Sequence, residues 1–343
     1  MKKTIFLISL TVLAVLLAIG GCERKVVIEH SELDDAASCF TCHGDNDAVL
    51  LAAKGEWQNS IHASGNNVDY TNRGGGYDCT RCHDHQGFLD FLTTGELEAP
   101  YDQVSAIHCF TCHAPHTNGN LDLRTAAAYE LENGEIFDHG AANLCANCHH
   151  SRFDVRVITD NYEQSSTRFA AHHGPQADLL TGTGGYEMSG YTYNQSGHAN
   201  AVTDGCVGCH MGNPQVHDGY DIGGHSFNMV DEEGGYDLSG LCENCHASAD
   251  GFDFTADQDY DGDGEIEGYQ TEVEGLLDTL AELLVAEGVL DSIEHTPLEM
   301  TIADGNVAGA MQNFGTIEED RSMGIHNYQY IVSLLQNSID YLE

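Results

Sequence analysis

The sequence predicts a mostly irregular, loop-rich fold with short α-helices, followed by a helical C-terminal segment. Three observations predict it. The chain has 38 glycines among 343 residues and long stretches without helical or strand periodicity, so we expect little regular structure across residues 36–250. One cysteine motif recurs six times in that region, and covalent attachments at such motifs replace much of the usual apolar core. Apolar residues at helical spacing are found after residue 250.

The first 21 residues have the features of an export signal. Two lysines are followed by an apolar run and then by small residues, which is the order of a cleaved signal peptide. The small residues directly before Cys22 resemble the lipobox of bacterial lipoproteins, so cleavage would leave Cys22 as a lipidated N-terminus and residues 22–35 as a tether. The alternative is an ordinary signal peptide with an incidental cysteine. No later apolar run approaches the roughly 20 residues of a membrane-spanning helix. We therefore expect an exported protein, lipid-anchored at the outer membrane or cell surface, or periplasmic.

The charge balance limits the partners. The chain has 12 Lys+Arg against 55 Asp+Glu, and such a surface repels nucleic acid and anionic lipid. We expect no nucleic-acid partner and no contact with a membrane except through the N-terminal anchor. A cationic or metal-bearing partner, or a saline habitat, would fit this acidity.

The cysteines occur in one repeated pattern. Thirteen cysteines in an exported chain would ordinarily suggest disulfides, but twelve of them form six C-x-x-C-H pentads. The pentad cysteines are Cys39, Cys42, Cys79, Cys82, Cys109, Cys112, Cys145, Cys148, Cys206, Cys209, Cys242 and Cys245. The pentad histidines are His43, His83, His113, His149, His210 and His246. Only Cys22 remains, and it fits the lipid.

The pentads predict covalently bound haem. In C-x-x-C-H the two thiols form thioethers to the porphyrin, and the adjacent imidazole is the proximal ligand of the iron. A single copy is also compatible with a zinc knuckle or a redox-active C-x-x-C motif, whereas six copies ending in histidine favour haem. We therefore expect six haem c groups across residues 36–250. So few residues separate neighbouring pentads that the haems must lie close together, as electron transfer requires.

With these pentads the chain resembles the bacterial multihaem c-type cytochromes that metal-reducing and other anaerobic bacteria place in the periplasm or at the cell surface. Several phrases support the resemblance: GEWQNSIHASG (55–65), CFTCHAPH (109–116), AAHHGPQADLLTG (170–182), SGHAN (196–200), GGHSFNM (223–229) and MGIHNYQY (323–330). The resemblance implies an electron carrier whose partners are redox proteins or extracellular electron acceptors, with a homo-oligomer or filament as a further state.

The remaining histidines are candidates for the sixth ligand of each iron. Six of the 20 histidines lie in pentads, which leaves 14, enough for two histidines at every haem. Local context selects six distal ligands: His62, His116, His172, His198, His225 and His326. His172 and His173 are adjacent and must point apart, and we prefer His172. His108, His85 and His150 lie near pentads and are held in reserve.

The C-terminal segment, residues 251–343, carries two predicted helices. Apolar residues recur at helical spacing in 269–288 and again from about Met323 to Leu342. We expect both helices to dock on the haem region. The second would supply His326 as a distal ligand, and Gly324 would allow a close approach.

An acidic loop precedes the first of these helices. Asp259, Asp261 and Asp263 alternate and are followed by Gly264 and Ile266, which matches the first eight positions of an EF-hand calcium loop. Position 12 is Gln270 rather than glutamate, so Glu267 or Glu272 would have to complete the site. The sequence thus predicts a structural calcium site, with an ordinary solvated acidic loop as the alternative.

Two classes of function compete. An electron carrier between periplasmic or outer-membrane donors and an extracellular acceptor needs mostly bis-histidine, low-spin haems. A multihaem reductase of nitrite, hydroxylamine or a sulfur oxyanion needs one open haem and a basic pocket. All six pentads end in histidine and basic residues are scarce, so the carrier is favoured over the enzyme, and we assign no catalytic residue. A subunit of a conductive filament and a haem-storage protein are further alternatives.

Overall fold

The computed structural model describes residues 47–63, 77–97, 101, 104–202, 204–213, 215–217, 220–231, 235–246 and 251–343. The signal peptide, the tether, Cys22 and the first pentad (Cys39, Cys42 and His43) lie outside the described residues, so those assignments stay predictions. Contacts divide the chain into residues 1–51 and residues 52–343, and the architecture below is that of the second unit. Among the described residues, none of the helices has both the length and the apolar character needed to cross a membrane.

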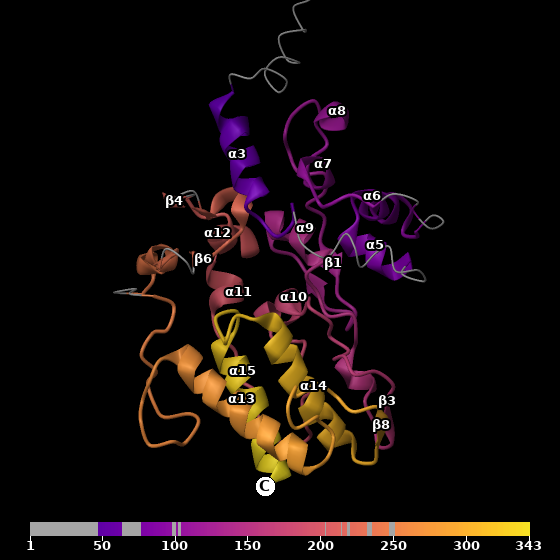
Figure 1. The fold of residues 1–343 in the computed structure, drawn as a ribbon, viewed down its shortest axis with the longest axis vertical. Helices are drawn as coiled ribbons and strands as arrows, with labels where there is room; N and C mark the ends of the chain where they lie inside the picture. Colours follow the sequence, from indigo (N-terminus) through magenta and orange to yellow (C-terminus); the bar gives the residue numbers. More distant parts are fainter. Residues whose placement is uncertain are drawn as a thin grey trace, which may run out of the picture. The chain divides into compact units, whose positions relative to one another are not determined.

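Residues up to 246 form short elements joined by long connections, which confirms the predicted loop-rich fold (Figure 1). The α-helices are α3 (Ala48–Gln58), α5 (Tyr77–His83), α6 (His85–Thr94), α7 (Cys109–Cys112), α8 (Pro115–Asn118), α9 (Asn143–Ala146), α10 (Gln176–Thr181), α11 (His198–Ala201) and α12 (Cys206–His210). The 3-10 turns are η1 (Gly140–Ala142), η2 (Val155–Val157), η3 (Gly224–Ser226) and η4 (Ser239–Asn244).

The strands form small antiparallel pairs. They are β1 (Tyr129–Glu130) with β2 (Ile136–Phe137), β3 (Tyr162–Gln164) with β8 (Met300–Ile302), β4 (Gln215–His217) with β5 (Tyr220–Ile222), and β6 (Val230–Asp231) with β7 (Tyr236–Asp237). The β3–β8 pair, with Tyr162 opposite Ile302, joins the middle of the chain to its C-terminal segment. No larger sheet forms among the described residues.

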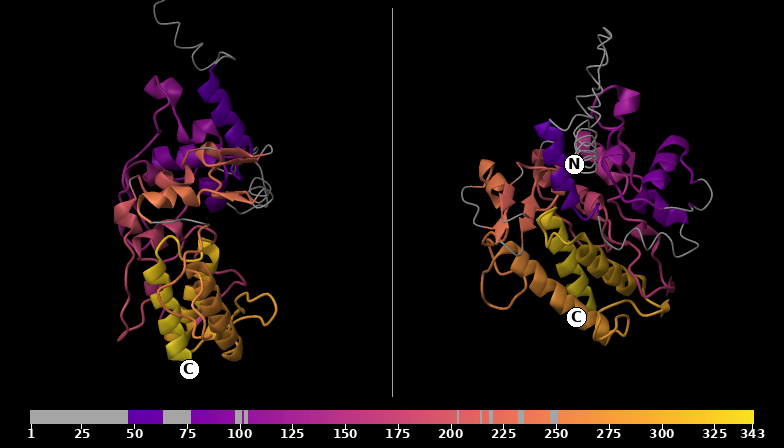
Figure 2. Two further views of the ribbon diagram at one scale, coloured as in Figure 1. Left: turned by 90° about the vertical axis from the view of Figure 1, so that its left-hand side faces the viewer. Right: turned by 45° about the horizontal axis from the view of Figure 1, so that its top comes forward.

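The main core belongs to three helices near the C-terminus: α13 (Tyr269–Ala286), α14 (Gly305–Asp320) and α15 (Tyr328–Leu342). They lie side by side in every view (Figures 1 and 2). Leu280, Met311 and Leu334 are completely buried between them, and Leu179 from α10 belongs to the same cluster. Burying such side chains stabilises the fold by about 1.5–3 kcal/mol each.

The first predicted helix is confirmed by α13, but α14 was missed by the sequence prediction. The reason is its composition: α14 is buried on nearly every side, so its apolar residues do not form the one-sided stripe of an amphipathic helix. Small residues permit this burial. A Cβ at Gly309 would lie 2.0 Å from the ring of Tyr186, and one at Gly315 would lie 1.9 Å from the ring of Phe169.

The second predicted helix starts later than expected. α15 begins at Tyr328 rather than near Met323, because Arg321, Met323 and Gly324 have φ values of 62°, 46° and 99°. This left-handed backbone ends α14 and cannot continue as a right-handed helix. His326 therefore lies in the turn between α14 and α15, which corrects its predicted position on the helix.

Candidate metal centres

Each described pentad is built as a single helical turn or part of one. α5 and α12 contain the pentads at 79–83 and 206–210. In the other three, the histidine N–H donates to the carbonyl of the first cysteine. These hydrogen bonds are His113 to Cys109 (2.9 Å), His149 to Cys145 (2.9 Å) and His246 to Cys242 (2.8 Å). The turn brings two thiols and one imidazole close together, as attachment of one porphyrin requires.

Each of the five described pentad histidines faces a histidine from outside the pentads. The ring centroids are 6.2 Å apart for His83 and His172, 6.3 Å for His113 and His225, 6.1 Å for His149 and His62, 6.4 Å for His210 and His326, and 6.2 Å for His246 and His198. Metal–imidazole bonds are about 2 Å long, so two rings that share one ion have centroids roughly 6 Å apart. The spacing and the adjacent thiols fit haem c with two axial imidazoles.

The structure thus brings five of the six expected distal histidines opposite pentad histidines. The sixth, His116, lies in α8 with its ring 6.1 Å from that of Phe110. The remaining pentad histidine, His43, lies outside the described residues, so a pair of His43 with His116 stays a prediction.

The rings of adjacent His172 and His173 lie 4.5 Å apart rather than pointing apart as expected, but they have different partners. His172 has a φ of 62° and faces His83, whereas Nδ1 of His173 pairs with the carboxylate of Glu319. The reserve histidines have other neighbours. His108 lies against His85 with centroids 4.1 Å apart, and His150 Nε2 lies 3.2 Å from the hydroxyl of Tyr129.

Burial keeps several of these imidazoles neutral. Burial, followed by the charge of His149, lowers the pKa of His62 to about 4. Burial, followed by the charges of His173 and Arg152, lowers the pKa of His172 to about 4. An imidazole binds a metal through an unprotonated nitrogen, so both side chains are in the ligating state at neutral pH.

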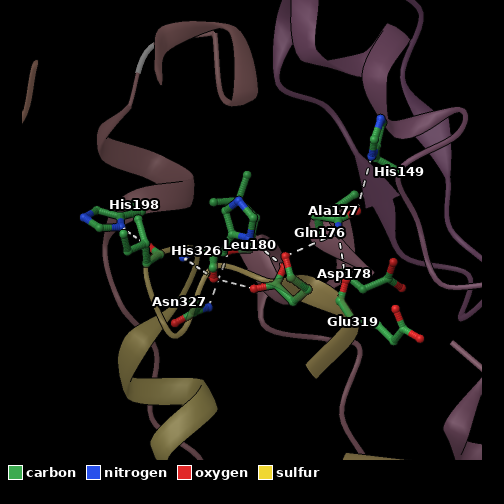
Figure 3. Close-up of polar contacts among 12 residues, drawn as sticks. His149, Gln176, Ala177, Asp178, Leu180, His198, Glu319, His326 and Asn327 are labelled. Carbon is green, nitrogen blue, oxygen red and sulfur yellow. Dashed lines mark hydrogen bonds and ion pairs between the residues drawn. The ribbon is translucent and has the colours of Figure 1, made fainter. Parts of the chain in front are cut away.

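A polar network links two of the ring pairs (Figure 3). Nδ1 of His149 lies 3.3 Å from Oε1 of Gln176, and Nε2 of Gln176 donates to the main-chain carbonyls of Glu319 (3.2 Å) and Asp320 (3.4 Å). The Asp320 carboxylate in turn pairs with His326 at 2.6 Å. The C-terminal end of α14 is therefore connected by hydrogen bonds to His149 of one ring pair and to His326 of another.

Cysteines of different pentads are in contact. The thiols of Cys82 and Cys148 are close enough to shift each other's pKa, as are those of Cys145 and Cys206, and the thiol of Cys82 lies 4.0 Å from the carbonyl of Asn147. The pentad at 145–149 therefore lies between those at 79–83 and 206–210. Sequence reasoning left the spatial order of the pentads open, because nothing local records which of them meet.

A cavity of about 510 Å³ adjoins Cys82, and both positive and negative side chains line it. Arg81 and Arg152 lie in its wall together with Glu96 and Glu132, and the Arg81 guanidinium lies 3.8 Å from the centre of the Phe91 ring. Burial and the charge of Arg152 lower the pKa of His83. Two guanidinium groups and two carboxylates therefore lie beside this pentad.

The acidic loop is closed by Glu272, one of the two residues proposed for the last position. Its buried carboxylate accepts hydrogen bonds from the backbone of Tyr260 (2.6 Å), Asp261 (3.2 Å) and Glu267 (3.1 Å). One ligand atom each from Asp259, Asp261 and Glu272 lie within 4.8 Å of one another, as do those from Asp261, Asp263 and Glu267. This is the oxygen donor set that calcium prefers.

Asp178, which the sequence analysis did not select, has a perturbed carboxyl. Burial raises its pKa from 3.8 to about 7, although the Ser151 N–H donates to it at 2.6 Å. The pKa of Asp178 is higher in the folded than in the unfolded protein. The contribution of its protonated carboxyl to the free energy of unfolding is therefore full below about pH 4 and is lost as the pH rises to about 7. Asparagine does not ionise, so we expect Asp178→Asn to keep this stability as the pH rises, a difference of up to roughly 4 kcal/mol in the free energy of unfolding.

The measurement is the urea midpoint of the holoprotein from pH 4 to pH 8. The difference between Asp178→Asn and wild type should grow across that window. Asp122→Asn, at an exposed position, is the control and should follow wild type. A constant difference would contradict the raised pKa.

Comparison with known proteins supports the fold. No protein-family model matches the chain, and no curated relative matches its sequence. Among solved structures it is similar to the outer cell wall cytochrome OcwA, with a TM-score of 0.50 and 21% identity over 84% of this chain and 50% of that one. It is also similar to the undecahaem cytochrome from the S-layer of Carboxydothermus ferrireducens, with a TM-score of 0.45 and 20% identity over 81% of this chain and 40% of that one. The chain spans about half the length of OcwA and shares the fold of that part.

Proposed function

We propose that the chain is an exported hexahaem c-type cytochrome that carries electrons between a periplasmic or outer-membrane donor and an extracellular acceptor. The observation that carries the proposal is the pairing of five pentad histidines with five outside histidines at 6.1–6.4 Å. Paired imidazoles fill both axial positions of an iron, which favours electron transfer over substrate binding. The likeness in fold to an outer cell wall cytochrome supports the same conclusion.

The proposed axial pairs are His83 with His172, His113 with His225, His149 with His62, His210 with His326, His246 with His198, and His43 with His116. The cysteine pair of each pentad would hold the porphyrin by thioethers. When bound, each haem supplies an iron that gains and loses one electron. The protein side chains hold the imidazoles in place and surround them with groups of different charge.

The guanidinium groups of Arg81 and Arg152 in the cavity beside Cys82 are the observation that favours a reductase instead, because positive charge attracts an oxyanion. However, Glu96 and Glu132 line the same cavity and oppose that attraction. The ring of His172 also faces that of His83, so both axial positions at that pentad have a candidate ligand. We therefore prefer the carrier.

The test is the EPR spectrum of the oxidised holoprotein together with its haem count. Six haems with low-spin ferric signals support the carrier. An intrinsic high-spin signal in the untreated protein would contradict it and favour the reductase, because one iron would then have an open position.

The proposal includes a lipid anchor at Cys22, which would hold the protein at the outer membrane or cell surface. Its partners would then be redox proteins or extracellular acceptors. Conversion of Cys22 to serine should release the protein from membranes and abolish labelling by radioactive fatty acid. Unchanged labelling would contradict the anchor.

We also propose a structural calcium ion in the loop of Asp259, Asp261 and Asp263, closed by Glu272. Calcium bound only by the folded state would stabilise it by about 3 kcal/mol at a concentration a hundredfold above Kd. Addition of EGTA should therefore lower the melting temperature. Asp259→Asn combined with Asp263→Asn should abolish the response, and magnesium should not replace calcium. Equal melting curves with calcium and with EGTA would contradict the site.

A further inference from the structure

Asp320 makes a buried contact with one of the proposed ligands. It is the last residue of α14, and its side chain is completely buried. One carboxylate oxygen lies 2.6 Å from Nδ1 of His326, and the other accepts the hydroxyl of Ser322. The left-handed backbone at Arg321 turns the chain so that His326 returns to the end of the helix. The fold of the turn thus fixes this contact.

Negative charge at this position acts on both imidazoles of the pair. The C-terminal end of a helix carries partial negative charge, and here it coincides with a carboxylate. The ring of His210 lies 6.4 Å from that of His326, which the Asp320 carboxylate contacts at 2.6 Å. Asp320 therefore lies close enough to influence His210 as well as His326.

Nδ1 of the other described ligands has a weaker contact, a neutral partner or, at His113, no hydrogen-bond partner. Neutral oxygens lie near three of them: the Ile325 carbonyl near His198 (2.6 Å), the Phe227 carbonyl near His210 (3.1 Å) and the Gln176 amide near His149 (3.3 Å). The Glu56 carboxylate lies 3.4 Å from Nδ1 of His225, and both of those side chains are partly exposed. Among the described pairs, the contact of Asp320 with His326 is the shortest with a carboxylate and the most buried.

The pentad at 79–83 has an environment of mixed charge. Arg81 and Arg152 line the cavity beside Cys82 together with Glu96 and Glu132. Buried positive charge favours the ferrous state of a nearby iron and buried negative charge favours the ferric state, because charges interact more strongly in a low dielectric.

We infer that Asp320 gives the iron between His210 and His326 the lowest reduction potential among the five described pairs. A carboxylate that accepts the Nδ1 proton makes the imidazole a stronger donor, and hydrogen bonding of this kind tunes the bound metal. The inference rests on the proposed function, since it requires His210 and His326 to bind one iron. Asp320 acts through His326 and is a positioning residue rather than a ligand.

Spectroelectrochemical titration of the holoprotein tests the inference. Asp320→Asn keeps the shape of the side chain and removes its charge, so the most negative reduction step should move to higher potential while all haems stay low-spin. Ser322→Ala removes the hydroxyl that competes with His326 for the Asp320 carboxylate, so the same reduction step should move to lower potential. Glu319→Gln is the matched control. Glu319 is next to Asp320 in the sequence, but its carboxylate pairs with His173, which is not a proposed ligand. Removing its charge should therefore leave the reduction steps in place.

Three outcomes would overturn the inference. The titrations of Asp320→Asn and wild type could superimpose, or Glu319→Gln could shift the same reduction step by an equal amount. A high-spin haem in Asp320→Asn would mean that Asp320 only keeps His326 in place. Failure of the proposed ligation has a different signature. In that case His326→Ala would keep every haem low-spin, whatever Asp320→Asn does to the potentials.

Discussion

Replacing His326 with alanine is expected to convert one haem from low spin to high spin. The ring of His326 lies 6.4 Å from that of His210, and alanine offers no atom that could bind the iron. The EPR spectrum of the oxidised holoprotein should gain one high-spin ferric signal and lose one low-spin signal. Added imidazole should reverse the change by filling the vacated position.

The same substitution should also loosen the C-terminal segment. His326 is partly buried and paired with the fully buried Asp320, so its loss leaves a buried carboxylate with only Ser322 as a side-chain partner. Removing one member of a buried pair costs about 3 kcal/mol or more. Limited proteolysis should therefore cut residues 251–343 faster than in wild type.

His173→Ala is the control for both effects. His173 is paired with the neighbouring Glu319 and is not among the proposed ligands. Its removal should leave the spin states unchanged. If His326→Ala also leaves them unchanged, the turn after α14 serves only packing, and a reserve histidine such as His108 would have to be the ligand.

Local sequence patterns were sufficient for some of these features. The pentads are self-contained turns, and α13 shows a one-sided apolar stripe, so both could be recognised without knowledge of the fold. The distal histidines were chosen from their local sequence context. Five of the six then face a pentad histidine in the structure.

Features that depend on tertiary contacts were not predictable. α14 has no stripe because neighbours cover it on nearly every side. The pairing of Asp320 with His326 depends on the left-handed turn at Arg321, a conformation that arginine rarely adopts and that its sequence context does not indicate. The buried Asp178 resembles a surface residue in sequence, since its partner Ser151 is 27 residues away.

The proposed function predicts that removing the attachment site at 145–149 divides the path of electrons between the haems. In the double variant Cys145→Ser with Cys148→Ser, one haem should be lost, as measured by the mass of the intact protein. The pentad at 145–149 contacts those at 79–83 and 206–210 through Cys148 and Cys145. Without it, electrons must cross a wider gap, and electron transfer slows steeply with distance.

The measurement is stopped-flow reduction by a limiting amount of one donor. Wild type should redistribute electrons in a single fast phase, and the double variant should show an added slow phase. The matched control is Cys242→Ser with Cys245→Ser, which also removes one haem but leaves the contacts of Cys82 with Cys148 and of Cys145 with Cys206 in place. Because both variants lose the same number of thioethers, a slow phase in both would mean that haem loss alone disturbs the protein. A slow phase confined to the first variant would identify the 145–149 site as the junction through which the neighbouring sites exchange electrons.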